Sequence, residues 1–338
     1  MPNWLHAGAT EPVARLVRDN KVESIHHGVL AVVDSHGKKV GSAGDPRVAV
    51  YPRSTLKPLQ TLAVLNTGVE LTDLEVALTS ASHSGSKAHQ DAVHEFLLHH
   101  QLSPGLLQCP ADWPLDREER LAMLARGEEK NQLAMNCSGK HTGFLAACQH
   151  QGWELDTYLS PVHPLQRAIM ATVEDYSGEA PSQVSIDGCG APLLGLSIMG
   201  LAKAMARLVS EDSPQSRRIV ESIGKNAWAI AGDGHANTVV IERLGGIAKI
   251  GAEGLVVIAV PSGYAVAVKI LDGSMRATTP VALEALRQVG AIDEGVAKAL
   301  IAQTSEQVFG GESLLGGLRG HSRLLCPEAP IWASRGNR

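Results

Sequence analysis

The chain has 338 residues, of which 44% are hydrophobic and 19% are charged, and its formal net charge is −5 at pH 7. This composition is typical of a soluble globular protein, and the negative charge argues against a nucleic-acid partner. No stretch reaches the roughly 18 apolar residues of a membrane helix and the first ten residues lack a signal-peptide pattern, so we expect no membrane association and a cytoplasmic location.

Strands are predicted near both ends of the chain. Two apolar runs at 28–33 and 38–41 flank a polar turn that contains Gly37, which predicts a hairpin, and 48–51 predicts another strand. Helical spacing begins after Thr55, and residues 72–75 have the form of a capping box. Further helices are predicted over 117–126, 141–151, 165–175 and 193–208. Late strands are predicted over 238–243, 247–250, 255–260 and 264–270.

This order of elements predicts an α/β fold in which an antiparallel sheet is built from both chain ends around a largely helical middle. It differs from the alternating strand and helix order of a doubly wound fold. Because the chain has no repeat or long polar linker, we predict a single domain over 1–338. Its sheet lobe would comprise about 20–55 and 236–338, and its helical lobe about 56–235.

The sharpest local feature is the Ser-x-x-Lys pair of Ser54 and Lys57, directly after a predicted strand. Residues three apart share one face of a helix, so the amine is expected within reach of the hydroxyl. Pro58 is tolerated in a first helical turn, where the helix dipole favours a neutral lysine and an oxyanion. The pair therefore predicts a serine nucleophile with a lysine base, and the alternative is an N-cap serine beside a solvated lysine.

Two further clusters carry polar side chains. The hydroxyls in residues 80–86 could supply a proton relay, or they could bond backbone groups alone. Residues 136–141 and 187–190 contain Cys137 and Cys189, whose thiolates could hold zinc with Lys140 or His141 as third ligand and water as fourth. Buried inert cysteines are the alternative. A phosphate-binding loop is excluded, because alanine stands at position 134 where that motif needs glycine.

Five motifs occur together in order. They are Arg-Ser-x-x-Lys-Pro at 53–58, Ala-Ser-His-Ser at 81–84, Asn-Cys-Ser-Gly-Lys-His at 136–141, Asp-Gly-Cys at 187–189 and Val-Lys-Ile-x-Asp-Gly at 268–273. This set resembles the Rhizobium etli type L-asparaginases, the asparaginase II family, from about residue 26 to beyond 280. The resemblance implies a fold similar to serine β-lactamases and glutaminases, hydrolysis of L-asparagine to L-aspartate and ammonia, and a homodimer.

The resemblance also implies roles for particular residues. It implies catalytic pairs of Ser54 with Lys57 and of Ser82 with Lys269. It implies zinc ligands at Cys137, Lys140 and Cys189, with no organic cofactor. Charge complementarity suggests Arg53 for the substrate carboxylate and Asp187 for its ammonium group, and His141 is also assigned to substrate binding.

Several alternatives are compatible with the sequence. The residues after Cys189 and after Ser84 depart from the family pattern, which puts the substrate range in doubt. A glutaminase or another β-lactamase-like serine hydrolase is the nearest alternative, although the chain lacks Lys-Thr-Gly on a late strand. A non-catalytic amino-acid-binding or metal-binding protein is another, and a third makes Cys137 the nucleophile.

Overall fold

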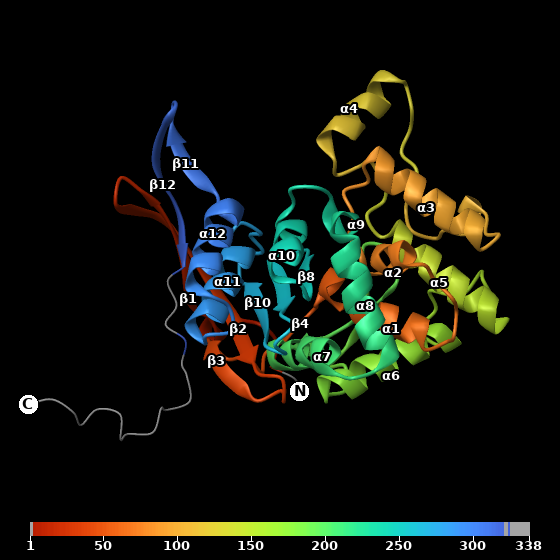
Figure 1. Cartoon of the computed structure of the whole chain (residues 1–338), viewed down its shortest axis with the longest axis horizontal. Helices are drawn as coiled ribbons and strands as arrows, with labels where there is room; N and C mark the ends of the chain where they lie inside the picture. The colour runs from red at the N-terminus through yellow and green to blue at the C-terminus, as the bar shows by residue number, and fades with distance from the viewer. Residues whose placement is uncertain (1–2, 321–323, 325–338) are drawn as a thin grey trace, which may run out of the picture.

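The computed structural model describes residues 3–320 and residue 324, and it contains one large antiparallel sheet. The strand order is β11-β12-β1-β2-β10-β9-β8, and β3 pairs with β2. Strands from both ends of the chain thus form one sheet, as predicted (Figure 1). The strands are β1 (Glu11–Arg18), β2 (Lys21–Val33), β3 (Lys39–Ala43), β8 (Ile247–Gly251), β9 (Leu255–Ala259), β10 (Ala265–Ile270), β11 (Gln307–Gly310) and β12 (Ser313–Gly320).

The central strands of this sheet are covered on both faces. Every residue of β9 and β10 is buried, so neither face of this pair meets solvent. Helix α7 (Ile198–Ser210) packs against β2, β9 and β10, and α11 (Thr278–Gln288) packs against β9, β10 and β12. Helix α12 (Glu294–Thr304) packs against α11. The continuous apolar run of β9 is what a strand buried on both faces requires.

The middle of the chain forms a helical lobe beside the sheet (Figure 1). Its helices are α1 (Lys57–Leu65), α2 (Asp73–Ser80), α3 (Lys87–His99), α4 (Arg117–Ala125), α5 (Ser138–Gln151), α6 (Pro164–Ser177), α8 (Pro214–Lys225), α9 (Ala227–Ala231) and α10 (Ala236–Leu244). Short 3₁₀ turns lie at η1 (Ala7–Ala9), η2 (Arg53–Leu56) and η3 (Pro104–Leu106). Two small strand pairs join β4 (Ala49–Val50) to β7 (Leu196–Ser197) and β5 (Val184–Ile186) to β6 (Pro192–Leu194).

Two glycines let α5 pack tightly against α2. A Cβ at Gly139 would lie 2.6 Å from the Leu78 carbonyl oxygen, and one at Gly143 would lie 2.5 Å from Thr79 Oγ1. Real Cβ atoms do not approach that closely, so a side chain at either position would push the helices apart. This close packing fixes the N-terminus of α5, where the predicted metal ligands begin.

Some predicted elements differ from the structure. Residues 238–243 are helical within α10, because the helix that starts at Ala236 overrides the β-branched composition of the segment. Residues 48–51 form the short strand β4 outside the main sheet, and β1 begins at Glu11, before the predicted edge of the sheet lobe. Residues 321–323 and 325–338, placed in that lobe by prediction, lie outside the described residues. No helix in the described ranges has the length and hydropathy to cross a membrane.

Candidate active site

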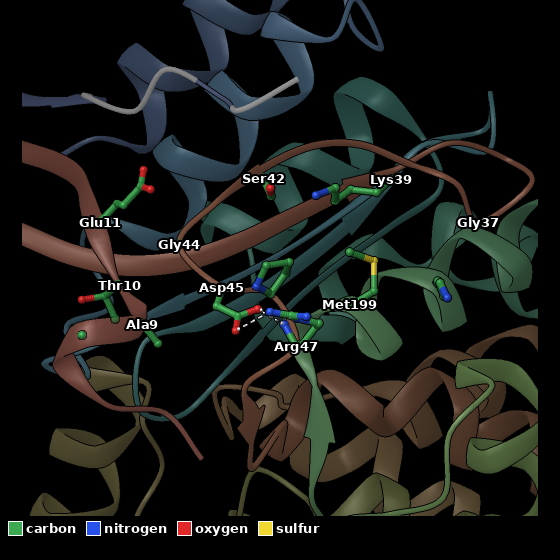
Figure 2. Close-up of a pocket in the computed structure, with 13 residues that line it drawn as sticks. Ala9, Thr10, Glu11, Gly37, Lys39, Ser42, Gly44, Asp45, Arg47 and Met199 are labelled. Carbon is green, nitrogen blue, oxygen red and sulfur yellow. Dashed lines mark hydrogen bonds and ion pairs between the residues drawn. The ribbon is translucent and has the colours of Figure 1, made fainter. Parts of the chain in front are cut away.

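A cavity of about 410 Å³ brings together most of the predicted site residues. It is lined by Arg53, Ser54, Ser82, Pro110, Asp112, Leu115, Met135, Asn136, Cys137, Asp187, Gly188, Cys189, Ile250, Gly251, Ala252 and Met275. These residues come from η2, the end of β8, the turns of the β5–β6 and β8–β9 hairpins, and other connecting loops. A larger hollow of about 760 Å³ lies near β3 and the start of α7, but none of its lining residues belongs to the predicted site (Figure 2).

Ser54 lies in η2, the 3₁₀ turn that leads into α1. In the described part of the chain its hydroxyl makes no hydrogen bond, and the residue lines the cavity. Side chains three apart in a 3₁₀ turn lie on the same side, so Ser54 and Lys57 face the same region. The hydroxyl is therefore placed to attack a bound group.

The Lys57 amine is buried and donates to Ser82 rather than to Ser54. Its Nζ lies 2.8 Å from Ser82 Oγ and 3.1 Å from Cys137 Sγ, and it also donates to the Ala81 carbonyl oxygen. Lys57 itself is 1% exposed. The structure thus pairs Lys57, the predicted partner of Ser54, with Ser82, the predicted partner of Lys269.

Two other hydroxyls of residues 80–86, those of Ser80 and Ser86, have structural partners. Ser80 bonds Thr61, and Ser86 caps α3 and contacts His89. Ser84 is buried beside Gly232. Within this cluster the cavity is lined by Ser82, which therefore is the candidate relay.

Lys269 lies elsewhere in the sheet lobe and does not line the cavity. Its Nζ donates to the carbonyl oxygens of Glu253 (2.5 Å) and Ile270 (2.6 Å), so it closes the β8–β9 turn. The predicted pairing of Lys269 with Ser82 therefore gains no support from its contacts. The reason is that its amine is engaged by backbone carbonyls of the β8–β9 turn and the end of β10.

Lys249 is a buried lysine that the sequence reasoning missed. It lies on β8, is 1% exposed, and donates to the Ile250 carbonyl oxygen at 2.9 Å. Burial and then the charge of Lys57 hold its pKa well below the usual range, while Cys137 acts in the opposite direction. The next residues, Ile250 and Gly251, line the cavity and run against η2. The sequence signal was a lysine inside the apolar run 247–250.

Arg53 and Asp187 form an ion pair on the cavity wall. Arg53 Nε donates to Asp187 Oδ1 at 2.7 Å, and the two side chains are 27% and 14% exposed. Arg53 has a φ of +52°, in the left-handed region, which costs a residue other than glycine roughly 1–2 kcal/mol. Asp187 opens the turn of the β5–β6 hairpin, and the same turn carries Cys189.

The two predicted cysteine ligands and Lys140 converge behind this wall. Lys140 Nζ lies 3.1 Å from Cys189 Sγ, and Lys140 and both cysteines are at most 3% exposed. Contact with the Cys137 thiol, helped by Lys140 and opposed by burial, holds the pKa of Cys189 far below its usual range. Contact with Cys189, together with burial, raises the pKa of Cys137. The opposite shifts favour the thiolate form at Cys189 over Cys137.

His141 is fully buried and does not line the cavity, so its predicted contact with substrate is not supported. Its Nδ1 lies 2.7 Å from the Tyr158 hydroxyl. Burial lowers its pKa to about 4, and the neighbouring Cys189 opposes this shift. The ring is thus neutral at pH 7 and supports the cysteines from behind.

A family model described as L-asparaginase II matches residues 14–319. The chain belongs to this family. The family assignment made from the sequence motifs is confirmed, and the narrower Rhizobium etli type stays a prediction. Membership supports a hydrolase of the amidohydrolase kind. No curated protein matches the chain.

Solved structures similar to this L-asparaginase II family member include two proteins. One is a beta-lactamase from Mycobacterium bovis, with 13% identity over 82% of this chain and 94% of that chain and a TM-score of 0.42. The other is EstCE1, a hydrolase with promiscuous acyltransferase activity, with 12% identity over 86% of this chain and 93% of that chain and a TM-score of 0.36.

Proposed function

We propose that this protein is an L-asparaginase that hydrolyses the side-chain amide of L-asparagine to L-aspartate and ammonia. Family membership supports amide hydrolysis. The observation that carries the proposal is the cavity that holds an unbonded Ser54, the Lys57-bound Ser82 and the Arg53–Asp187 ion pair together. The groups needed for nucleophilic attack, proton transfer and amino-acid binding therefore share one wall.

In the proposed mechanism Ser54 Oγ attacks the side-chain amide carbon, and its proton passes to the Ser82–Lys57 pair. The tetrahedral intermediate breaks its C–N bond, and the same pair returns the proton to the departing ammonia. Water then gives a proton to the pair and attacks the ester, which releases aspartate and restores the Ser54 hydroxyl. The pair thus acts as base and acid in turn.

Lys249 takes the place that was predicted for Lys269 in this proposal. Burial, with the charge of Lys57, holds the pKa of Lys249 well below the usual lysine range, which favours the neutral amine. A lysine amine that lacks its extra proton can accept the proton that Ser54 loses. Lys269, bonded to two carbonyl oxygens, has no comparable role.

The ion pair on the wall supports recognition of an α-amino acid. Arg53 uses Nε for Asp187, which leaves its two terminal nitrogens to bind a carboxylate. Asp187 has a second carboxylate oxygen for an ammonium group. A molecule with both charges, such as L-asparagine, matches this arrangement better than a neutral amide does.

We expect Arg53→Lys to raise the KM for L-asparagine by about 30-fold or more, because a point charge cannot replace the planar guanidinium. Both residues bear the same cost of a positive φ, so the backbone is a matched background. Steady-state ammonia release measures the change, and L-asparaginamide, which lacks the carboxylate, serves as the control substrate. Equal losses on both substrates would contradict a role of Arg53 in binding the carboxylate.

Assays of ammonia release from asparagine and glutamine, and of ring opening of a β-lactam, test the function itself. Preference for glutamine or the β-lactam would favour the neighbouring hydrolase classes, and absence of turnover on all three would favour a binding protein. Cys137 is the weaker candidate nucleophile because its raised pKa disfavours the thiolate. A homodimer remains part of the proposal on the family resemblance alone, and the cytoplasmic location stays a prediction.

We propose a zinc site at Cys137, Lys140 and Cys189. The donor set fits, because two sulfurs and an amine converge in a buried cluster and soft thiolates suit zinc. Zinc there would add positive charge beside the cavity and fix the turn that carries Asp187. The residues of the chain itself perform the proton transfers described above.

We expect Cys189→Ser to remove zinc bound at this cluster, because a serine hydroxyl is a poor ligand at neutral pH. Metal analysis of the purified full-length protein measures the loss. Cys148→Ser is the matched control, since Cys148 is also a buried free cysteine but does not line the cavity. Equal zinc content in both variants would contradict the assignment.

A further inference from the structure

A second group of metal-binding side chains lies away from the cavity, between α2 and α3. Glu75 is the third residue of α2, His99 is the last residue of α3, and His100 follows it. One ligand atom from each residue lies within 4.8 Å of the other two. The loop that joins these two helices carries Ser82. The group lies at the opposite end of the helix pair from that loop.

The carboxylate of Glu75 is fixed in place before any metal binds. Its Oε2 accepts a hydrogen bond from the Thr72 backbone amide at 2.7 Å within a capping box. Its Oε1 lies 2.7 Å from His99 Nδ1. Both carboxylate oxygens are therefore oriented by neighbouring groups, and carboxylate oxygen is a ligand that zinc accepts.

The imidazole of His100 is the least satisfied member of the group. Its Nε2 lies 3.6 Å from Glu75 Oε2, which is too long for a hydrogen bond. The atom is buried and has no hydrogen-bond partner among the described residues. A purely structural ion pair leaves this nitrogen unexplained, whereas a shared cation would satisfy it.

We propose that Glu75, His99 and His100 form a second site for a divalent transition metal, with Zn²⁺ as the bound ion. Two imidazoles and one carboxylate are a known zinc ligand set. Zn–N and Zn–O bonds of about 2.0–2.2 Å place tetrahedral ligand atoms about 3.3–3.5 Å apart. The observed separations of 2.7 Å and 3.6 Å lie on either side of this value, so small side-chain movements complete the site.

The surroundings fit a cation with one solvent ligand. The two histidines lie at the C-terminus of α3, where the helix dipole favours positive charge, and the ionisable Glu75 side chain faces the opposing dipole of the first turn of α2. The His99 side chain is 57% exposed, so water can reach the fourth position. A metal here would link α2 to α3 and stabilise the helices on either side of Ser82.

The test is a Zn²⁺ titration of chelator-stripped, full-length protein by calorimetry, with metal content measured after desalting. His100→Gln and His99→Ala should each lose one zinc equivalent relative to the wild type. Their affinity for this zinc ion should fall by more than the roughly 10–100-fold that is lost when a residue that only orients a metal ligand is removed. In wild-type protein, saturation of the site at 100 times its Kd should raise Tm by about 5 °C.

His150→Gln is the control, because it removes an exposed imidazole from α5 and should keep the full zinc content. Cys189→Ser distinguishes the two proposed zinc sites. This variant should still bind the zinc ion that His100→Gln loses. His99→Ala removes a mostly exposed side chain, so it tests the site even where His100→Gln disturbs folding. Zinc content and affinity unchanged in His99→Ala would overturn the proposal. The readout uses no substrate, so it does not depend on the asparaginase activity.

Discussion

Replacing Ser54 with alanine is expected to lower kcat/KM for ammonia release from L-asparagine by more than about 10⁴-fold. The change removes the oxygen that forms the bond to carbon, while Ser82 and the ion pair remain in place. Ser54 makes no side-chain hydrogen bond within the described residues, so folding should be unaffected. Intact-protein mass spectrometry on rapidly quenched samples should detect an acyl-enzyme in the wild type and none in the variant.

Two further serines make this prediction specific. Ser82→Ala should lower the rate by about 10²–10⁴-fold through loss of proton transfer while still permitting acylation of Ser54. Ser84→Ala changes a buried hydroxyl in the same loop that does not line the cavity, and its activity should stay near the wild-type value. If Cys137→Ser rather than Ser54→Ala abolished the acyl-enzyme, the nucleophile would be the cysteine.

The parts of the site that are close in the chain could be predicted from the sequence. Ser54 and Lys57 lie in one turn, and Cys137 and Lys140 lie in the first turn of α5, so local helical geometry brings each pair together. Approach of Cys189 to Lys140 needs the β5–β6 hairpin, which spacing alone does not position. The motif resemblance, unlike the spacing, implies that Cys189 and Lys140 lie together.

The choice between two strand lysines could not be made from the sequence. In the sheet, Lys249 is opposite Val257, while Lys269 is opposite Leu255 and Val29. Both lysines interrupt apolar strands, so the alternation of side chains along a strand does not show which one lies near the site. The packing of η2 against β8 decides between them, because it places the end of β8, and not β10, on the cavity wall.

The partner of Lys57 also depended on tertiary structure. Helical spacing predicts that it faces Ser54, but α2 ends beside α1 and presents the Ala81 carbonyl and the Ser82 hydroxyl to the amine. A buried ammonium or amine requires hydrogen-bond partners, and these two groups satisfy it where Ser54 alone could not. Lys57 thus contacts the Ser82 hydroxyl, and Ser54 lies in η2, the turn before it.

Replacing Lys249 with methionine is expected to stabilise the fold and to impair catalysis. Methionine fills a similar volume without the cost of burying an amine, so the free energy of unfolding at pH 7 should rise by roughly 1–2 kcal/mol. The rate should fall by about 10²–10⁴-fold, because the site loses its neutral amine. Denaturant unfolding and ammonia release measure the two effects on the same preparation.

The pH dependence of stability isolates the amine from the change in packing. Folding lowers the pKa of Lys249, so the unfolded chain binds a proton that the folded chain lacks at all pH values between the two pKa values. Lys249 therefore destabilises the fold near pH 7, and this penalty fades as pH rises toward the unfolded lysine value of about 10.4. Between pH 7 and pH 9.5, the free energy of unfolding of the wild type should increase relative to that of Lys249→Met. A constant difference, or a methionine variant that keeps full activity, would show that Lys249 is not held neutral for catalysis.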